Sequence, residues 1–475
     1  MRRRPAALAA ELCLVLLPTA ACTGATPGSA APAPSAAAPA TGAAGCPAER
    51  AAPDPDRPVV DLEFSLAEDL RTVTGTESVV FTPDRPTGEL VFRLVPNGPD
   101  ATAVGNRLTV DAARGDDVVA GGYESAGAGA PGGLYVLTLA EQLAAGESTA
   151  VELDFTLSLG DGGFERLGTA ADVSWFASGA PLLAWEPGVG WARDPFVALT
   201  GETASSPVSD TTIAVEAPAD LTVLMTGDQD EPTRAREGRR TWTSHEPVAR
   251  DVSVAVGRFT TAETEVAGVR VTTGVLPGSG RDPARLARAT AEAIEQLGAR
   301  FGDFPYATLT VPWLPDFGGG IEYPSSILLA SDAEVVLVHE VAHMWFYGMV
   351  GDSQFRDPWL DESFASYAES VTGEPDADRV SRLLAAEGDV GGSMASFADD
   401  RRYVTAVYGK GAAMLLTARE QAGAEAFDAA VRCFVDATAW SIATPADVAA
   451  ALADLPAALA VLQQAGALDA EDLPG

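Results

Sequence analysis

The chain has 475 residues, which is enough for two or three domains with substantial hydrophobic cores. It carries 31 Lys and Arg against 67 Asp and Glu, a formal net charge of −36, and the acidic residues are spread along its length. Nucleic-acid binding needs a basic footprint, so this composition argues against a nucleic-acid partner. An acidic surface of this kind favours solubility.

The first 21 residues have the pattern of a signal peptide. Arg2–Arg4 are basic, Ala7–Leu17 are apolar apart from Glu11, and Thr19-Ala-Ala-Cys22 closes the segment. Small residues before a cysteine resemble a bacterial lipobox, which predicts cleavage before Cys22 and lipidation of that cysteine. We therefore expect an extracytoplasmic protein, anchored by lipid to the outer face of a bacterial cell membrane. Ordinary secretion is the alternative.

Residues 22–57 are expected to form a low-complexity tether. Thr23–Ala44 consists of Ala, Pro, Gly, Ser and Thr, without charge or periodicity, which is typical of a flexible linker. After cleavage and lipidation, Cys46 and Cys433 remain. In an oxidising compartment these two cysteines could pair, and two isolated thiols are the alternative; the sequence does not decide between them.

Residues 58–262 show a period of two. Val60, Leu62, Phe64 and Leu66 alternate with polar residues. Similar short runs are separated by Gly, Pro, Asp and Asn: Leu90–Val95, Tyr135–Leu139, Val151–Leu157, Ile213–Val215 and Val252–Val256. Many short strands without a long helix predict an antiparallel β saddle or sandwich. Its histidine, His245, has no partner motif nearby and is expected at the surface.

Residues 263–475 are expected to form an α+β domain that becomes mostly helical at its C-terminal end. Asp282 and Pro283 predict the start of an amphipathic helix, and Thr308–Trp313 predicts a strand. After Asp399 helical patterns dominate, and Thr444 to Asp447 form a predicted capping box.

The segment 335–343, with the sequence VVLVHEVAH, contains the pattern HExxH. Ser331 and Glu334 predict a capping box at the start of its helix. Residues four apart lie on one helical face, so His339 and His343 can reach one metal ion, and Glu340 can hold an attacking water as general base. The alternative is a buried helix with two hydrogen-bonded core histidines.

Glu362 is the candidate third metal ligand, and eighteen residues separate it from His343. Asp357 and Pro358 predict the N-cap and first residue of a second helix, which would place Glu362 in its second turn. Two histidines and a glutamate with an open fourth position are the catalytic Zn²⁺ pattern. Glu369, on the same helical face, is either an acceptor for a ligand imidazole or a surface charge.

Two other residues are candidates for contacting a substrate. Attack on a carbonyl produces an oxyanion that needs a donor besides the metal, and Tyr408 is our candidate, with simple packing as the alternative. Glu322 follows three glycines, which let backbone approach a ligand closely. Its carboxylate could bind a substrate's ammonium group, or it could be an ordinary loop residue.

Four segments in chain order resemble the aminopeptidase N family of zinc metallopeptidases: Gly319–Tyr323, His339–Trp345, Trp359–Tyr367 and Tyr408–Gly411. Members of that family are gluzincins with a thermolysin-like catalytic domain behind an N-terminal β saddle. The resemblance extends from about residue 58 to the C-terminus.

The resemblance implies one zinc ion on His339, His343 and Glu362. It implies that Glu340 is the general base and proton shuttle, and that Tyr408 stabilises the tetrahedral intermediate. It further implies a substrate-binding role for three residues, with Glu322 anchoring the α-amino group and Gly319 and Gly320 lining the peptide. Tyr403 matches a second tyrosine of the family.

Two departures from the family pattern affect the expected substrate cleft. Ile321 and Tyr323 stand where the family usually has Met and Asn. The chain also stops where many relatives begin a helical domain that roofs the cavity, which implies a more open cleft.

The expected function is that of a zinc-dependent aminopeptidase, which hydrolyses N-terminal residues from peptides with a free N-terminus by means of a zinc-activated water. One alternative is another gluzincin, either glycyl-aminopeptidase-like or an endopeptidase. The other is a non-catalytic binding protein anchored to the cell surface.

Overall fold

The computed structural model describes residues 46, 49–162, 164–201, 204–315, 317–373 and 375–474. The predicted signal peptide, the predicted lipidation site at Cys22 and most of the predicted tether lie outside these residues. Within this described part, no helix combines the length and apolar character needed to cross a membrane.

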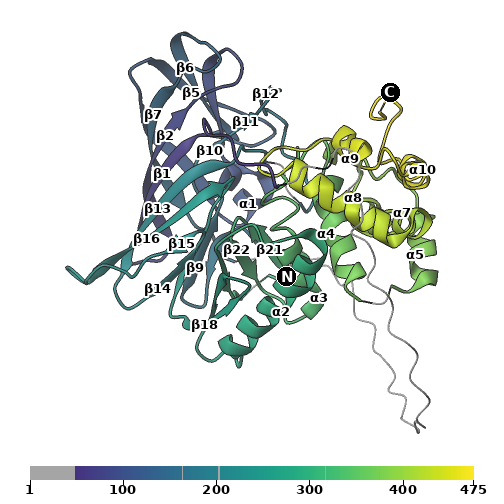
Figure 1. Ribbon diagram of the computed structural model, residues 1–475. Helices are drawn as coiled ribbons and strands as arrows, with labels where there is room; N and C mark the ends of the chain where they lie inside the picture. The colour runs from purple at the N-terminus through teal and green to yellow at the C-terminus, as the bar shows by residue number, and fades with distance from the viewer. Residues whose placement is uncertain are drawn as a thin grey trace, which may run out of the picture.

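A β-rich region forms the N-terminal part of the molecule, and helices gather beside it (Figure 1). One sheet has the strand order β15 (Asp228–Gln229), β16 (Arg239–Ala249), β13 (Ser209–Pro218), β1 (Val59–Leu66), β2 (Thr72–Phe81), β7 (Thr149–Ser158) and β4 (Arg107–Arg114). A second has the order β10 (Leu182–Leu183), β3 (Thr87–Arg93), β6 (Leu134–Leu143) and β5 (Val118–Glu124). A third has the order β14 (Thr222–Met225), β17 (Ser253–Gly257), β9 (Val173–Ala177) and β8 (Leu167–Ala170). The short pair β11 (Trp185–Glu186) and β12 (Gly190–Trp191) and the short helices η1 (Val95–Asn97) and α1 (Pro99–Ala103) complete this region.

These strands form because apolar residues alternate with polar ones, as the sequence predicts. In β1 the side chains of Val60, Leu62, Phe64 and Leu66 are buried, and the residues between them face outward. Most strand pairs are antiparallel as predicted, but β1 and β13 run parallel. His245, on β16, is exposed as expected and hydrogen-bonds Asp210.

A mixed sheet lies between the β-rich region and the helices. Its strand order is β18 (Thr260–Val266), β19 (Val269–Val275), β20 (Thr308–Pro312), β22 (Ser326–Leu329) and β21 (Gly320–Tyr323). Helix α2 (Pro283–Phe301) begins as predicted, with the Asp282 side chain accepting a hydrogen bond from the backbone of Ala284. The predicted domain boundary between residues 262 and 263 falls within β18, and its position stays a prediction.

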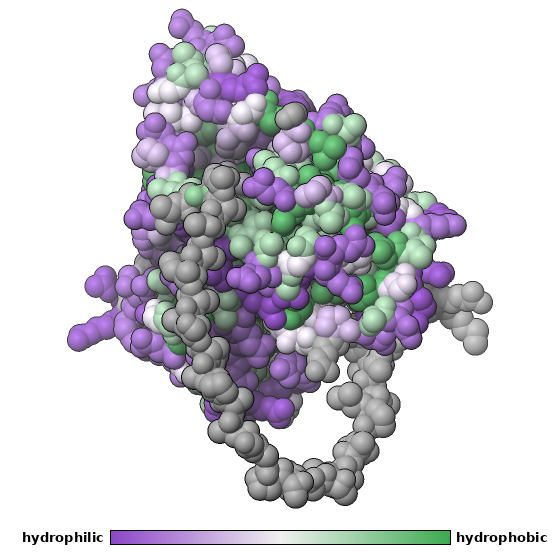
Figure 2. All heavy atoms as spheres, turned by 45° about the vertical axis from the view of Figure 1, so that its right-hand side comes forward, coloured by the Kyte–Doolittle hydropathy of each residue, from purple (hydrophilic) through white to green (hydrophobic). Residues whose placement is uncertain are grey.

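The helical part follows this sheet. Its elements are α3 (Glu334–Ala342), α4 (Trp359–Val371), α5 (Ala377–Leu384), η2 (Met394–Ser396), α6 (Asp400–Tyr403), the π-helix η3 (Val404–Lys410), α7 (Gly411–Ala422), α8 (Ala424–Ala437), α9 (Pro445–Ala451) and α10 (Pro456–Gln464). The Thr444–Asp447 capping box of α9 is present as predicted. Hydrophobic residues show more at the surface over this helical side than over the β-rich end (Figure 2). The predicted fold class, a β region followed by an α+β region that ends in helices, is confirmed.

The predicted start of α3 is wrong. The Ser331 hydroxyl accepts a hydrogen bond from the backbone N–H of Ala333, two residues on, so it forms a local turn instead of a capping box. Ala333 is the N-cap, without a side-chain hydrogen bond. Helix α4 begins at Trp359, with Pro358 as its N-cap, so Glu362 lies in the first turn and not in the second as predicted.

A disulfide joins Cys46 to Cys433 of α8, with 5.2 Å between their Cα atoms. Of the two possibilities left open by the sequence, the structure therefore has the paired one. Arg50 reinforces the connection through an ion pair of 3.2 Å with Asp436. The segment that leads into β1 is thus fastened to the helical part of the molecule.

The β-rich region also contacts the chain that connects α3 to α4. The Arg250 guanidinium is buried and donates hydrogen bonds to the carbonyl oxygens of Ser206 (2.9 Å), Gly348 (3.3 Å) and Ser441 (3.2 Å). A Cβ atom at Gly351 would lie 2.4 Å from this guanidinium, so only glycine fits there. Arg250 therefore locks the segment between the two candidate ligand helices.

Candidate metal centre

The two motif histidines lie at the C-terminal end of α3. This helix forms because Leu337, Val338 and Val341 are buried against neighbouring elements, which outweighs the weak helix propensity of valine. His343 is the C-cap, but its φ of −61° and ψ of −14° are helical, so it stays on the same face as His339. The two rings lie 4.7 Å apart between centroids.

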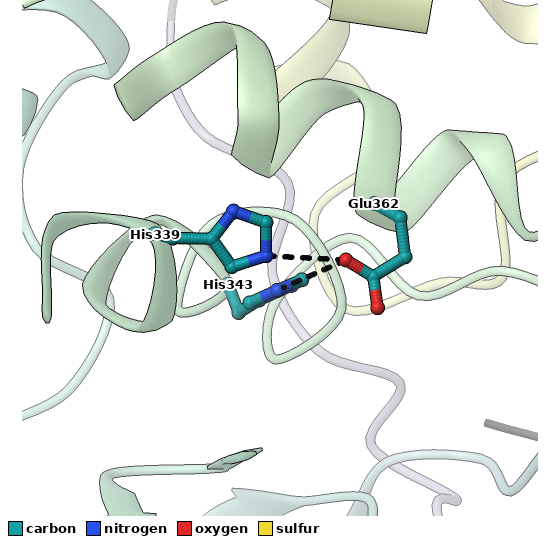
Figure 3. Close-up of side chains that lie close together, drawn as sticks. All are labelled: His339, His343 and Glu362. Carbon is teal, nitrogen blue, oxygen red and sulfur yellow. Dashed lines mark hydrogen bonds and ion pairs between the residues drawn. The ribbon is translucent and has the colours of Figure 1, made fainter. Parts of the chain in front are cut away.

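Glu362 of α4 meets both histidines. Its Oε2 atom lies 3.2 Å from His339 Nε2 and 3.6 Å from His343 Nε2 (Figure 3). One ligand atom from each of the three residues lies within 4.8 Å of the others, so the group could hold a metal ion. The structure thus brings together the three candidate zinc ligands.

The other nitrogen of each imidazole has its own carboxylate. His343 Nδ1 lies 2.5 Å from Asp361 Oδ1, and His339 Nδ1 lies 3.2 Å from Glu369 Oε2. A carboxylate on Nδ1 orients the ring and leaves Nε2 for a metal. Of the two alternatives for Glu369, the structure favours the imidazole acceptor over the surface charge. The role of Asp361 was not predicted from the sequence. The signal that could have indicated it is its position as a second carboxylate directly before Glu362.

The pKa values of two residues at the centre show that acidic groups surround its histidines, an environment that favours a bound cation. Burial works against a charged His339, but hydrogen bonds to Glu362 and Glu369 outweigh it and raise its pKa to about 10. Burial raises the pKa of Glu340 to about 8, opposed by the nearby histidines. A divalent cation at the three facing ligand atoms would displace the proton from the metal-facing nitrogen of His339, because metal ligands must be deprotonated. Two imidazoles and one carboxylate are a donor set that Zn²⁺ accepts.

Gly320 lies directly against Glu340. A Cβ atom on Gly320 would come within 2.5 Å of Glu340 Cγ, so the absence of a side chain lets strand β21 approach the candidate base. Gly319, with φ of +122°, has open space around its Cβ position, and its carbonyl accepts a hydrogen bond from Ala330. The glycines expected to line a peptide therefore lie at the edge of the centre.

Strand β21 presents different side chains on its two faces. Ile321 and Tyr323 pack against Trp175 and Phe259 from the β-rich region. Glu322 points the opposite way, and one of its carboxylate oxygens lies within 4.8 Å of ligand atoms of His343 and Asp361. Glu322 is 5% exposed, and its Oε1 atom has no hydrogen-bond partner in the described part of the chain. A buried carboxylate oxygen in this state is suited to receive a donor from a ligand.

Tyr408 reaches the centre from the π-helix η3. Its hydroxyl donates a hydrogen bond of 2.5 Å to Glu362 Oε1, and its ring is stacked on His339 at 5.9 Å. Burial and the Glu362 carboxylate raise its pKa well above the usual value, so the hydroxyl keeps its proton and remains a donor. The ring of Tyr403 lies 5.8 Å from that of Tyr408.

The comparisons with known proteins agree with this geometry. Residues 323–387 match the sequence model of the Peptidase family M1 domain. The fold resembles the crystal structure of an M1 zinc metallopeptidase from Deinococcus radiodurans, with a TM-score of 0.65, 19% identity, and coverage of 88% of this chain and 95% of that one. A mutant of that protein bound to a Tyr-Ser-Ala substrate gives 0.64 with the same identity and coverage. A two-domain M1 zinc metallopeptidase mutant bound to L-arginine gives 0.63, again at 19% identity with 88% and 95% covered. No curated protein sequence matches the chain.

These comparisons confirm three predictions made from the sequence. The M1 domain match bears out the resemblance to the aminopeptidase N family and the assignment as a zinc metallopeptidase. One zinc ion is the cofactor that this domain and the donor set both indicate. The structural likeness, at 19% identity, establishes the fold.

Proposed function

We propose that the protein is an aminopeptidase, which removes the first residue from peptides with a free N-terminus. The observation that carries this proposal is the buried Glu322 carboxylate, whose Oε1 atom lacks a partner among the described residues, beside the candidate metal centre. A substrate ammonium group bound there would place the first carbonyl next to the metal. A buried carboxylate with an unpartnered oxygen at this position favours a substrate with a free ammonium group over the uncharged chain that an endopeptidase would bind there.

We assign the zinc ion to His339, His343 and Glu362, the donors that face one another. Zinc bound there supplies Lewis acidity, which polarises the scissile carbonyl and lowers the pKa of a water. Asp361 and Glu369 hold the two imidazoles in the tautomer that leaves Nε2 unprotonated.

Glu340 is the group that moves the proton in this mechanism. Its carboxylate takes the proton from the attacking water and delivers it to the nitrogen of the leaving amine. Tyr408 donates its hydroxyl to the oxyanion that develops on the former carbonyl, after releasing its hydrogen bond to Glu362. Gly320 allows the peptide backbone to lie beside Glu340.

The test compares a free tripeptide with its N-acetylated form. Glu322→Ala should lower kcat/KM for the free peptide by roughly 100-fold, because a buried carboxylate–ammonium pair is lost. It should leave the N-acetylated peptide at its already low rate. An equal loss on both substrates would remove Glu322 from substrate recognition.

The general-base assignment has its own test. Glu340→Gln should retain zinc, measured as metal per chain, and lose roughly 10³-fold or more in kcat. Near-normal turnover with bound zinc would mean that another group is the base. A panel of peptides that differ in the first residue separates a general aminopeptidase from a glycine-specific one.

We further propose that the chain is anchored through lipid on Cys22, with secretion as the alternative, since its leader has the lipobox pattern. Cys22→Ser should move the protein from the membrane fraction to the medium. If the wild-type protein is found wholly in the medium, the lipid anchor is refuted and ordinary secretion is supported.

A further inference from the structure

One strand of the β-rich region carries a carboxylate on its otherwise apolar inner face. In β2 the side chains of Val73, Val79 and Phe81 are buried, and Glu77 stands between them in the same alternation. Glu77 is 3% exposed, and its Oε2 atom has no hydrogen-bond partner within the described residues. Buried polar atoms nearly always have a partner, so this oxygen is suited to a ligand.

Glu77 lines a cavity on the inner face of the largest sheet. The neighbouring strands β13, β1 and β2 supply one side of the cavity (Figure 1). Residues 180–183, 206–207 and 250–252 supply the rest of its lining, and all lining residues except the half-buried Leu182 are buried. The space holds a few molecules the size of water. None of the candidate zinc ligands lines it, so this cavity is separate from the metal centre.

A second carboxylate, that of Asp251, lines the same cavity. Its Oδ1 atom accepts a hydrogen bond from the backbone N–H of Val252 at 2.7 Å, and its Oδ2 atom accepts one from the Ser178 hydroxyl at 2.5 Å. Burial raises the pKa of Glu77 well above its usual value, and the negative charge of Asp251 raises it further. The two carboxylates are therefore close enough to repel each other.

The buried pair lacks a neutralising side chain. In the described part of the chain, no basic residue opposes the effect of burial on the pKa of Glu77. The positive charge of Arg166 only partly opposes burial at Asp251, whose pKa rises to about 6. Arg250 lines the cavity, but backbone carbonyl oxygens occupy its guanidinium. Buried carboxylates are ordinarily paired or bound to a metal, so the pair favours a cation in the cavity.

Two hydroxyls on the β13 side of the cavity also suit a cation. The Ser209 hydroxyl donates to the carbonyl oxygen of Ala249 at 2.8 Å, and it lies 2.8 Å from the Thr211 hydroxyl. Each hydroxyl has one proton, so Thr211 donates its own to Ser209. Both protons are thus engaged within the protein, and only lone pairs remain at the Thr211 oxygen. The cavity therefore presents oxygen acceptors from three separate parts of the chain.

We propose that this cavity binds one Ca²⁺ ion, held by the carboxylates of Glu77 and Asp251, with the Thr211 hydroxyl oxygen and water completing its shell. Ca²⁺ takes oxygen ligands in a flexible geometry that accommodates such a mixed set. Its two charges balance the two carboxylates, whereas Na⁺ would leave one of them unbalanced. Mg²⁺ demands near-ideal octahedral geometry and loses its waters reluctantly, which a small cavity disfavours. The cavity is too small for an organic cation of more than a few heavy atoms.

A cation at this position would connect the sheet to the contact between the two regions of the molecule. Glu77 belongs to β2, and Asp251 directly follows Arg250, which holds the segment between α3 and α4. The ion would therefore stabilise the position of Arg250 and would take no part in the reaction. This inference does not depend on the proposed aminopeptidase function.

The test is a calorimetric titration of the zinc-loaded protein with Ca²⁺, at neutral pH, constant ionic strength and constant free zinc. We expect one Ca²⁺ per chain with a Kd of about 10⁻⁶–10⁻³ M, and binding of Mg²⁺ and Na⁺ that is weaker by about tenfold or more. Glu77→Gln and Asp251→Asn keep the side-chain shape and remove one charge each, so each should weaken Ca²⁺ binding by about tenfold or more. Glu63→Gln is the matched control, since it removes the same charge from an exposed position on β1, and its Kd should stay within about twofold of wild type.

Amide hydrogen exchange locates the bound ion, because an acidic chain also attracts Ca²⁺ to its surface. Saturating Ca²⁺ should slow exchange by about threefold or more in the wild-type peptides that contain Glu77 and Asp251, and should not do so in Glu77→Gln. If Asp251→Asn does not fold, Glu77→Gln decides alone. Tight Ca²⁺ binding that survives in the folded variants would overturn the proposal, as would a preference for Na⁺ or Mg²⁺. Wild-type protein without any response to Ca²⁺ would also overturn it, and would show that protons or water satisfy the two carboxylates.

Discussion

Glu246 offers a test of how the β-rich region holds the strand hairpin that carries Glu322. It lies on β16, is 4% exposed, and accepts hydrogen bonds from the Ser325 hydroxyl and the backbone of Val248. Ser325 forms the turn between β21 and β22, so Glu246 touches the hairpin that carries Glu322. Burial raises the pKa of Glu246 to about 7, and these hydrogen bonds only partly oppose it.

The sign of the pH effect follows from comparing the folded and unfolded chains. The unfolded carboxyl has a pKa of 4.5 and the folded one of about 7. Between these values the folded protein keeps a proton that the unfolded chain has released, so rising pH lowers the free energy of unfolding. At about 1.4 kcal/mol per pKa unit, the difference from 4.5 to about 7 amounts to about 3 kcal/mol of the free energy of unfolding. The protein has this contribution at low pH and has lost it once the pH is well above 7.

Glu246→Gln removes this titration and keeps a side chain of the same shape. The free energy of unfolding of the variant, relative to wild type, should therefore rise by about 3 kcal/mol between pH 4.5 and pH 8. The assay is urea unfolding followed by tryptophan fluorescence at several pH values, with zinc present for both proteins. Other titrating groups cancel in the difference, and Glu63→Gln, an exposed change on β1, should give a flat difference. A flat difference for Glu246→Gln as well would refute a buried carboxyl with a raised pKa at this position.

Three further predictions concern the centre and its supports. Tyr408→Phe should lower kcat by about 10²–10³-fold with little change in KM, measured on aminoacyl chromogenic substrates, because it removes a donor to the oxyanion; an unchanged kcat would leave Tyr408 a packing role only. Gly351→Ala should lower the free energy of unfolding by about 1–3 kcal/mol, since its Cβ would strike the Arg250 guanidinium, whereas Gly373→Ala, with no atom closer than 3.8 Å, should cost much less. Cys433→Ser should cost about 2–5 kcal/mol of stability, measured by urea unfolding, and leave kcat within about twofold; an unaltered unfolding curve would show that the disulfide to Cys46 adds nothing.

The metal centre could be predicted because two of its three ligands lie close together in the sequence, on one helix. The spacing of His339 and His343 brings both rings to one helical face, and that geometry survives although His343 is only the helix C-cap. The assignment of Glu362 rested on a weaker argument. The segment between His343 and Glu362 is long enough for a second helix to pack beside the first. That argument placed the helix start one residue early, so Glu362 is the fourth residue of the helix and not the fifth, and its carboxylate still faces both histidines.

The long-range contacts around the metal centre could not be predicted from the sequence. Arg166 and Tyr323 are 157 residues apart in the chain, and nothing in either neighbourhood indicates their hydrogen bond. Asp361 and Glu362 are adjacent carboxylates, and only the packing of α4 on α3 decides which one faces His343 Nδ1. The π-helix around Tyr408 is likewise invisible in the sequence, because residues 404–410 fit an ordinary helix equally well.

The β-rich region supports the strand that carries Glu322. All three candidate zinc ligands lie on α3, at its C-cap or on α4, and the β-rich region bears on them through Arg250, which holds the segment between these helices. Glu322, the proposed amine anchor, depends on the β-rich region more directly, because it lies on a strand whose other face buries Ile321 and Tyr323 against Trp175. Burial of two side chains of this size contributes roughly 3–6 kcal/mol, which is a large share of what holds β21 in place. Weakening the packing of β21 alone should therefore reduce the preference for a free N-terminus more than it reduces the zinc bound per chain.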